Sequence, residues 1–249
     1  MIERYTEMKF SYAYNLAGFL REKVFNNLPE EYLTDSVEPQ SHAKILKPHK
    51  ETVLHDYIQV ELRSELEYLG RKADPDLMAE DWESLLSDYN IDFSRDEVDE
   101  EQEEYIDYLE TKLKENIVSK IADETFQLLF SDRMFCLKFN EIIANEINEY
   151  QLDDYPDLLE KDGKPIRCTY FPVWVQRAVF LRDKGCCAVC LKDLSGLLKT
   201  DFNNAIDHIV PLNLGGINDV TNFQLICRDC NLEKLGHTIK TSEFYPTYF

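Results

Sequence analysis

The sequence predicts a mainly α-helical N-terminal domain joined to a small α+β C-terminal domain that is held by a four-cysteine zinc site. The first observation is the distribution of glycine, since only Gly18 and Gly70 of the eight glycines lie in residues 1–163. The second is charge: residues 1–163 carry 17 Lys and Arg against 40 Asp and Glu, whereas residues 164–240 carry ten against seven. The third is a pair of C-x-x-C motifs in the last third of the chain.

The domain boundary is expected at "EKDGKP", residues 160–165, where a glycine and a proline interrupt a charged stretch. An acidic, mostly helical domain then covers residues 1–160, and the second domain covers residues 165–240. At 249 residues the chain is long enough for two modest domains.

Apolar residues recur at helical spacing in the acidic domain. One amphipathic stripe runs through residues 105–128 and is interrupted by a single acidic position, Glu124. A second, less regular stripe begins at Val53, and Gly70 is expected to end this helix as its C-cap.

A third helix is expected from its capping residues, with Asp74 as the N-cap and Pro75 at the first helical position. The run "DEVDEEQEE", residues 96–104, follows it along the chain. We interpret this run either as a solvated helix face or as a surface that binds a protein partner or shields the chain from DNA.

The composition is that of a folded protein, with 44% hydrophobic and 12% aromatic residues, and no apolar run approaches the roughly 18 residues that span a bilayer. The weakly apolar stretch at residues 10–20 lacks a small-residue cleavage site, so we expect that it is not a signal peptide. We therefore expect a cytoplasmic protein with no membrane partner. An odd number of cysteines, seven, then favours reduced thiols or metal ligands over a disulfide framework.

The C-terminal domain is expected to begin with a short helix that contains Trp174, Ala178 and Leu181 and ends at Gly185, with Arg182 and Lys184 in its last turn. Downstream, "NNAIDHIVPL" at residues 203–212 is typical of a strand. "VTNFQLICRDCNLEKLG" at residues 220–236 predicts a turn that leads into a helix.

Two C-x-x-C pairs flank this predicted strand, and each can form a tight turn that presents two thiolates to one ion. Four thiolates in a tetrahedron suit a structural zinc ion. Cys186 would give a C-x-x-x-C pair in place of Cys187, and the tighter spacing is preferred. The predicted zinc ligands are Cys187, Cys190, Cys227 and Cys230.

Around the zinc site the polar residues follow an order that resembles the HNH endonuclease family, also called ββα-metal nucleases, in its zinc-bearing variant. The resemblance covers roughly residues 171–238 and leaves the first 160 residues outside it. The family pattern is a C-x-x-C pair, an acid, a histidine and an apolar-x-Pro, two glycines, an asparagine, and a second C-x-x-C pair followed by His or Asn. Here these are Cys187/Cys190, Asp207-His208-Ile209-Val210-Pro211, Gly215-Gly216, Asn222, Cys227/Cys230 and Asn231.

The resemblance implies a catalytic role for each polar residue of the motif. His208 would be the general base, since imidazole titrates near neutrality. Asp207 and Asn231 would supply oxygen ligands to a catalytic Mg²⁺ or Mn²⁺ ion. Asn222 would brace the loop that holds the base.

Adjacent residues of a strand point to opposite faces, so Asp207 and His208 can line one wall only if the strand bends or ends there. We expect the segment from Pro211 to the glycine pair, Gly215-Gly216, to allow this by closing a tight connection to the return strand.

Two further residues of the predicted helix are candidate substrate contacts. Lys234 lies one helical turn after Asn231 and is interpreted either as a phosphate contact or as a solvated side chain. His237 is interpreted as a substrate contact, as an additional ligand or as an ordinary histidine at a helix end.

The leading interpretation is therefore a metal-dependent endonuclease that hydrolyses phosphodiester bonds of nucleic acid, with DNA favoured, in phage defence or restriction. The alternative is a non-catalytic zinc-ribbon binding module, or a regulatory protein whose acidic domain mimics DNA or docks onto a partner. Residues 1–160 are expected to bind a protein partner or a second copy of this chain, because their charge repels phosphate; the alternative is a helical scaffold without a binding role.

Overall fold

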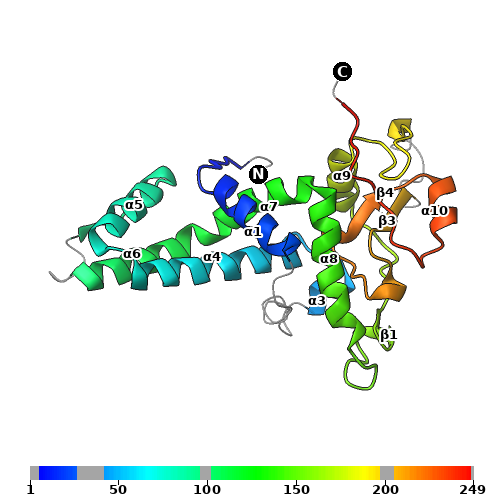
Figure 1. Ribbon diagram of the computed structural model, residues 1–249, viewed down its shortest axis with the longest axis horizontal. Helices are drawn as coiled ribbons and strands as arrows, with labels where there is room; N and C mark the ends of the chain where they lie inside the picture. Colours follow the sequence, from blue (N-terminus) through cyan, green and yellow to red (C-terminus); the bar gives the residue numbers. More distant parts are fainter. Residues whose placement is uncertain (1–5, 27–41, 96–101, 197–204, 248–249) are drawn as a thin grey trace. The chain divides into compact units, whose positions relative to one another are not determined.

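The computed structural model describes residues 6–26, 42–95, 102–196 and 205–247 (Figure 1). The chain is mainly helical, and its strands lie in the C-terminal region. It forms two compact units, of which the first comprises Met1–Leu20 and His55–Leu128, and the second comprises Arg21–Leu54 and Leu129–Phe249. The boundary expected at residues 160–165 falls inside the second unit, so the division into functional domains at 1–160 and 165–240 stays a prediction.

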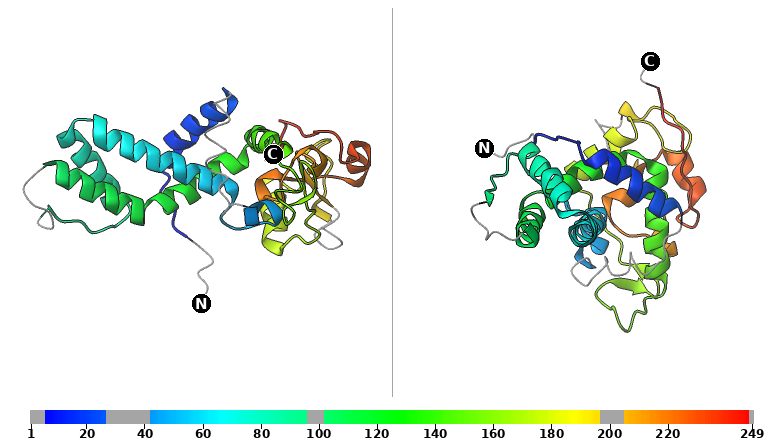
Figure 2. Two further views of the ribbon diagram at one scale, coloured as in Figure 1. Left: turned by 90° about the horizontal axis from the view of Figure 1, so that it is seen from below. Right: turned by 60° about the vertical axis from the view of Figure 1, so that its left-hand side comes forward.

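The first compact unit is helical within the described residues. Its charge is strongly acidic, with 9 Lys and Arg against 25 Asp and Glu in the two segments that form it. α5 and α6 pack side by side in it (Figures 1 and 2). Its described helices are α1 (Ala13–Phe25), α4 (Val53–Lys72), α5 (Pro75–Asp88), α6 (Gln102–Asn116) and α7 (Val118–Ser131). Of these, α1, α4 and α7 extend across the boundary into the second unit.

The capping prediction for α5 is confirmed, because Asp74 accepts hydrogen bonds from the backbone N–H groups of Asp76 and Leu77 and Pro75 opens the helix. The prediction that Gly70 ends α4 is wrong. The helix continues to Lys72, and a Cβ at position 70 would lie 2.7 Å from a Glu110 carboxylate oxygen, so Gly70 permits close packing inside a helix.

The apolar stripe over residues 105–128 belongs to two helices, α6 and α7, which meet at Ile117. Its acidic position, Glu124, is 2% exposed. The carboxylate accepts hydrogen bonds from Lys9 N, Phe10 N and Tyr89 Oη. Glu124 is thus a paired core residue of the first unit. Residues 96–101 of the acidic run lie outside the described residues.

The second compact unit is centred on a short antiparallel pair of strands, β3 (Ile206–His208) and β4 (Phe223–Leu225), in which His208 pairs with Phe223. The helix α9 (Val173–Arg182) packs against β4, and α8 (Arg133–Asn148) packs against the turn η6 (Val220–Asn222). Other elements of this unit are α3 (His42–Leu46), β1 (Leu159–Lys161), β2 (Lys164–Pro165), η5 (Leu212–Leu214) and α10 (Arg228–Lys234).

A buried ion pair attaches α9 to β4. Asp183, which is fully buried, accepts hydrogen bonds from Arg182 Nε at 2.9 Å and from the backbone N–H of Leu225 at 2.8 Å. Arg182 also donates to the carbonyl of Phe223, and Arg133 of α8 contacts the same carboxylate at 3.3 Å. These bonds fix the strand that pairs with β3.

The prediction of a tight connection between the two strands is wrong. Residues 209–222, which include two short 3-10 turns, separate β3 from β4. The two glycines are required at these positions for other structural reasons. Gly215 caps η5 with φ of 82°, and a Cβ on Gly216 would collide with the carbonyl of Val210. In the part of the chain that the structure describes, no helix is both long and apolar enough to cross a bilayer.

Candidate active site

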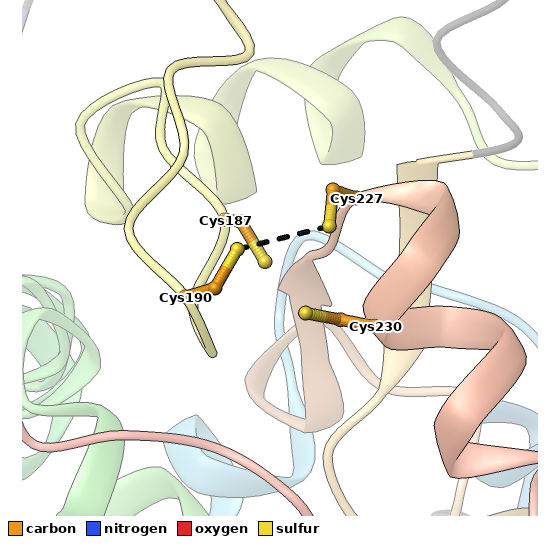
Figure 3. A group of neighbouring side chains, drawn as sticks. All are labelled: Cys187, Cys190, Cys227 and Cys230. Carbon is orange, nitrogen blue, oxygen red and sulfur yellow. Dashed lines mark hydrogen bonds between the residues drawn. The ribbon is translucent and has the colours of Figure 1, made fainter.

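The four predicted zinc ligands form one cluster, in which the sulfur atoms all lie within 4.8 Å of one another (Figure 3). Cys190 Sγ and Cys227 Sγ are 3.8 Å apart. Sulfurs placed 2.3 Å from a tetrahedral ion are separated by about 3.8 Å, so the cluster fits zinc. Cys186 lies outside the cluster, which confirms the C-x-x-C spacing for the first pair.

Two local structures present these thiols. The first pair sits on a loop in which Cys187 N donates to Lys192 O and Leu191 adopts a φ of 62°. The second pair belongs to the start of α10, with Cys227 as the N-cap residue and Cys230 in the first turn. Ala188 N donates to Leu225 O at 2.7 Å, so the loop is attached directly to β4.

Beside this cluster lies a polar cleft of about 330 Å³. Its lining includes three of the four residues predicted to be catalytic, Asp207, His208 and Asn231. Asp207 and His208 reach the same cleft because β3 ends at His208, and Asn231 comes from α10. The polar lining also includes Asn213 and two basic residues that the motif does not contain, Lys164 and Arg167.

His208 is 9% exposed, and its Nε2 lies 3.1 Å from Asn218 Oδ1. Burial is the main cause that lowers the pKa of His208 to about 4, and it outweighs the opposing effect of the Asp207 carboxylate. The imidazole is therefore neutral at neutral pH.

Asn218 determines which nitrogen of His208 carries the proton. Its Nδ2 lies within hydrogen-bond distance of two backbone carbonyls, Ile45 O and Ile166 O, and its Oδ1 accepts from the backbone N–H of Cys168. These three bonds fix the orientation of the amide, so Oδ1 faces His208 as an acceptor. Nε2 must then be the donor, and the lone pair of the neutral ring is on Nδ1.

Asp207 is held by two side chains of neighbouring elements. Its Oδ2 accepts from Lys234 Nζ at 2.6 Å and from Gln224 Nε2 at 3.2 Å. The side chain of Lys234 is fully buried, and its ammonium also donates to the carbonyls of His208 and Ile209. Lys234 is thus not a solvated surface residue, and its ammonium points toward Asp207.

Asn222 is buried and bonded on both sides of its amide. It accepts from Val210 N at 2.8 Å and donates to the carbonyls of Val210 and Ile217. Ile209 N also donates to the backbone carbonyl of Asn222. These bonds connect η6 to the chain that follows His208, so Asn222 contacts the loop and not the cleft.

His237 is exposed in the turn after α10 and is not among the cleft-lining residues. Its predicted substrate contact stays a prediction, as does a phosphate contact by Lys234.

The sequence did not reveal four polar residues at the site: Asn218, Gln224, Lys164 and Arg167. None of them belongs to a spacing pattern, and Asn218 contacts Ile45, far away in the sequence, so no local signal could have found them.

Residues 187–235 match a protein-family model described as HNH endonuclease. This segment contains both cysteine pairs together with Asp207, His208 and Asn231. No curated protein matches the chain significantly, and neither does any solved structure.

Proposed function

We propose that the segment matching the HNH endonuclease model is a working, metal-dependent nuclease that hydrolyses phosphodiester bonds, with DNA as the substrate. The observation that carries the proposal is the meeting of Asp207, His208 and Asn231 in one polar cleft beside the four-cysteine cluster. A zinc-ribbon module that only binds a partner would not need a carboxylate, a neutral imidazole and an amide around one opening.

The cysteine cluster would hold a structural zinc ion, because four thiolates leave no position for a substrate. The donors in the cleft are of a different kind. Asp207 Oδ2 is hydrogen bonded, no partner of Oδ1 is found among the described residues, and Asn231 adds an amide oxygen. Such hard oxygen donors fit Mg²⁺ or Mn²⁺, which would supply Lewis-acid stabilisation of the charge on the scissile phosphate.

The protein's own residues supply the proton transfer and the geometry. His208 accepts the proton of the attacking water at Nδ1, the nitrogen that Asn218 leaves without a proton. Lys234 and Gln224 orient the Asp207 carboxylate, and Asn222 holds the chain after His208 in place. Asn218, Lys234, Gln224 and Asn222 are therefore positioning residues.

Purified full-length protein with Mg²⁺ or Mn²⁺ should cleave at least one substrate among supercoiled plasmid, linear duplex, single-stranded DNA and RNA. The metal chelator EDTA should stop the reaction. Metal-independent binding to these nucleic acids without any cleavage would favour the non-catalytic binding module instead.

The assigned tautomer of His208 can be tested without an activity assay. In the wild type at neutral pH, the ¹⁵N chemical shifts of the ring should show a protonated Nε2 and an unprotonated Nδ1. Asn218→Ala removes the acceptor, so both tautomers should become populated and the cleavage rate should fall. Asn213→Ala is the matched control, because Asn213 lines the same cleft but its side chain donates to Gly236 O. A wild-type ring protonated at Nδ1 would contradict the assignment.

The acidic first unit supports a second part of the proposal, that it binds a protein partner or a second copy of this chain. Its excess of 25 acidic over 9 basic residues disfavours nucleic acid as its own ligand. A role in phage defence or restriction, and a cytoplasmic location, stay predictions from the sequence.

A further inference from the structure

Two cations in the cleft come from a part of the chain outside the segment that matches the HNH endonuclease model. Lys164 belongs to β2, and Arg167 lies in the extended stretch after that strand. Both line the cleft together with Asp207, His208 and Asn231. The cleft therefore has oxygen donors from β3 and α10 and positive charges from an independent segment.

Asn218 fixes Arg167 relative to the proposed base. Its Nδ2 donates to the carbonyl of Ile166 at 2.8 Å, and its Oδ1 accepts from the N–H of Cys168 at 3.1 Å. The backbone on both sides of Arg167 is thus held by the buried side chain that also holds the imidazole of His208. This arrangement holds the backbone of Arg167 and the imidazole of His208 on one shared, buried anchor.

The Arg167 side chain is available to a ligand. It is exposed, and the described residues offer it no hydrogen bond, ion pair or ring contact. Its charge is close enough to lower the pKa of His208. Lys164 is partly engaged with exposed Glu160 at 2.9 Å, a kind of pair that is weak in water. The ammonium of Lys234 is already occupied by Asp207.

We propose that Arg167, assisted by Lys164, binds the phosphodiester group of the nucleic acid in the cleft and places it against His208. This proposal rests on the proposed nuclease function. A guanidinium can donate two parallel hydrogen bonds to phosphate oxygens, which suits a residue that must position the group as well as attract it. Arg167 would then neutralise part of the negative charge of the phosphate.

The test uses the full chain with His208→Ala in the background, so that nothing is cleaved, and a short fluorescent oligonucleotide as duplex DNA, single-stranded DNA or RNA. Arg167→Ala should raise the dissociation constant roughly tenfold, because one charge-assisted contact is lost. It should also reduce the salt slope of binding by about one. Arg177→Ala is the matched control: Arg177 is exposed on α9 of the same unit and is not among the cleft-lining residues.

Equal affinity and equal salt slope for the two arginine variants would overturn the proposal, and so would a lack of binding to all three probes. A cleavage assay of the wild-type protein, which keeps His208, distinguishes the phosphate-site proposal from the nuclease proposal. If binding depends on Arg167 but the wild type cleaves nothing, the phosphate site is supported and the nuclease function is contradicted. If the wild type cleaves but Arg167→Ala and Arg177→Ala bind equally well, the phosphate site is contradicted and the nuclease function is supported.

Discussion

His208→Ala should lower the rate of phosphodiester cleavage by roughly 10²- to 10⁴-fold, the contribution of a positioned general base. The binding of Mg²⁺ and of DNA should change little, since Asp207, Asn231 and Arg167 stay in the cleft. The comparison is best made under single-turnover conditions, together with titrations of metal and DNA into both proteins. Asp207→Ala, by contrast, should lose metal binding at the cleft as well as activity.

The pH dependence follows from the burial of His208. The pKa of His208 is lowered from 6.5 to about 4, so the ring should remain an active base well below pH 6.5, and activity should fall as the pH falls toward about 4. The neutral ring also favours the folded state. This contribution to the free energy of unfolding is complete above the unfolded-state pKa and is lost as the pH falls through the folded-state pKa.

If His208→Ala turned over every substrate of the wild type at the wild-type rate, the assigned role of His208 as the base would be contradicted.

How much the sequence could predict depends on whether an interaction is local. The two C-x-x-C pairs and the N-cap of α5 depend on neighbours within a few residues, and the structure confirms both the sulfur cluster and the cap. The long apolar stripe over residues 105–128 was correct in its spacing. It could not show that the chain divides into α6 and α7 at Ile117, because a break of one residue leaves the period of apolar residues nearly intact.

The cleft was predictable in its chemistry but not in its supporting contacts. The order of Asp207, His208 and Asn231 indicated the site, whereas the direction of the Lys234 ammonium depends on how α10 packs on β3. Asn218 connects His208 to Ile45 and to the segment around Arg167. Such a three-way contact between distant segments has no spacing in the sequence, so only the folded structure can bring it to light.

Removal of the zinc ion should have the largest effect on stability. Purified protein should contain about one zinc per chain. Cys230→Ser or Cys187→Ser should lower that content and unfold much of the C-terminal region, because the apparent binding free energy of a structural zinc is about 10–16 kcal/mol and is coupled to folding. Circular dichroism, elemental analysis and hydrogen exchange of the same samples would measure the loss.

The structure explains why this loss should extend to the cleft. α10 has only seven residues, which is too short for a helix that is stable on its own, and two of the four ligands lie at its beginning. The same helix carries Asn231 and Lys234, so both the proposed oxygen donor and the cation that is bonded to Asp207 depend on it. Through the bond from Ala188 N to Leu225 O, the first cysteine loop also supports β4.

Cys186→Ser is the matched control, because Cys186 is the neighbour of Cys187 in the chain and lies outside the sulfur cluster. It should keep its zinc, its fold and its cleavage activity. The helices of the first unit should keep their protection from hydrogen exchange in every variant, since all four ligands belong to the second unit. A folded wild-type protein with far less than one zinc per chain would contradict the assignment. Equal stability of Cys187→Ser and Cys186→Ser would contradict it as well, because only Cys187 of these two residues belongs to the cluster.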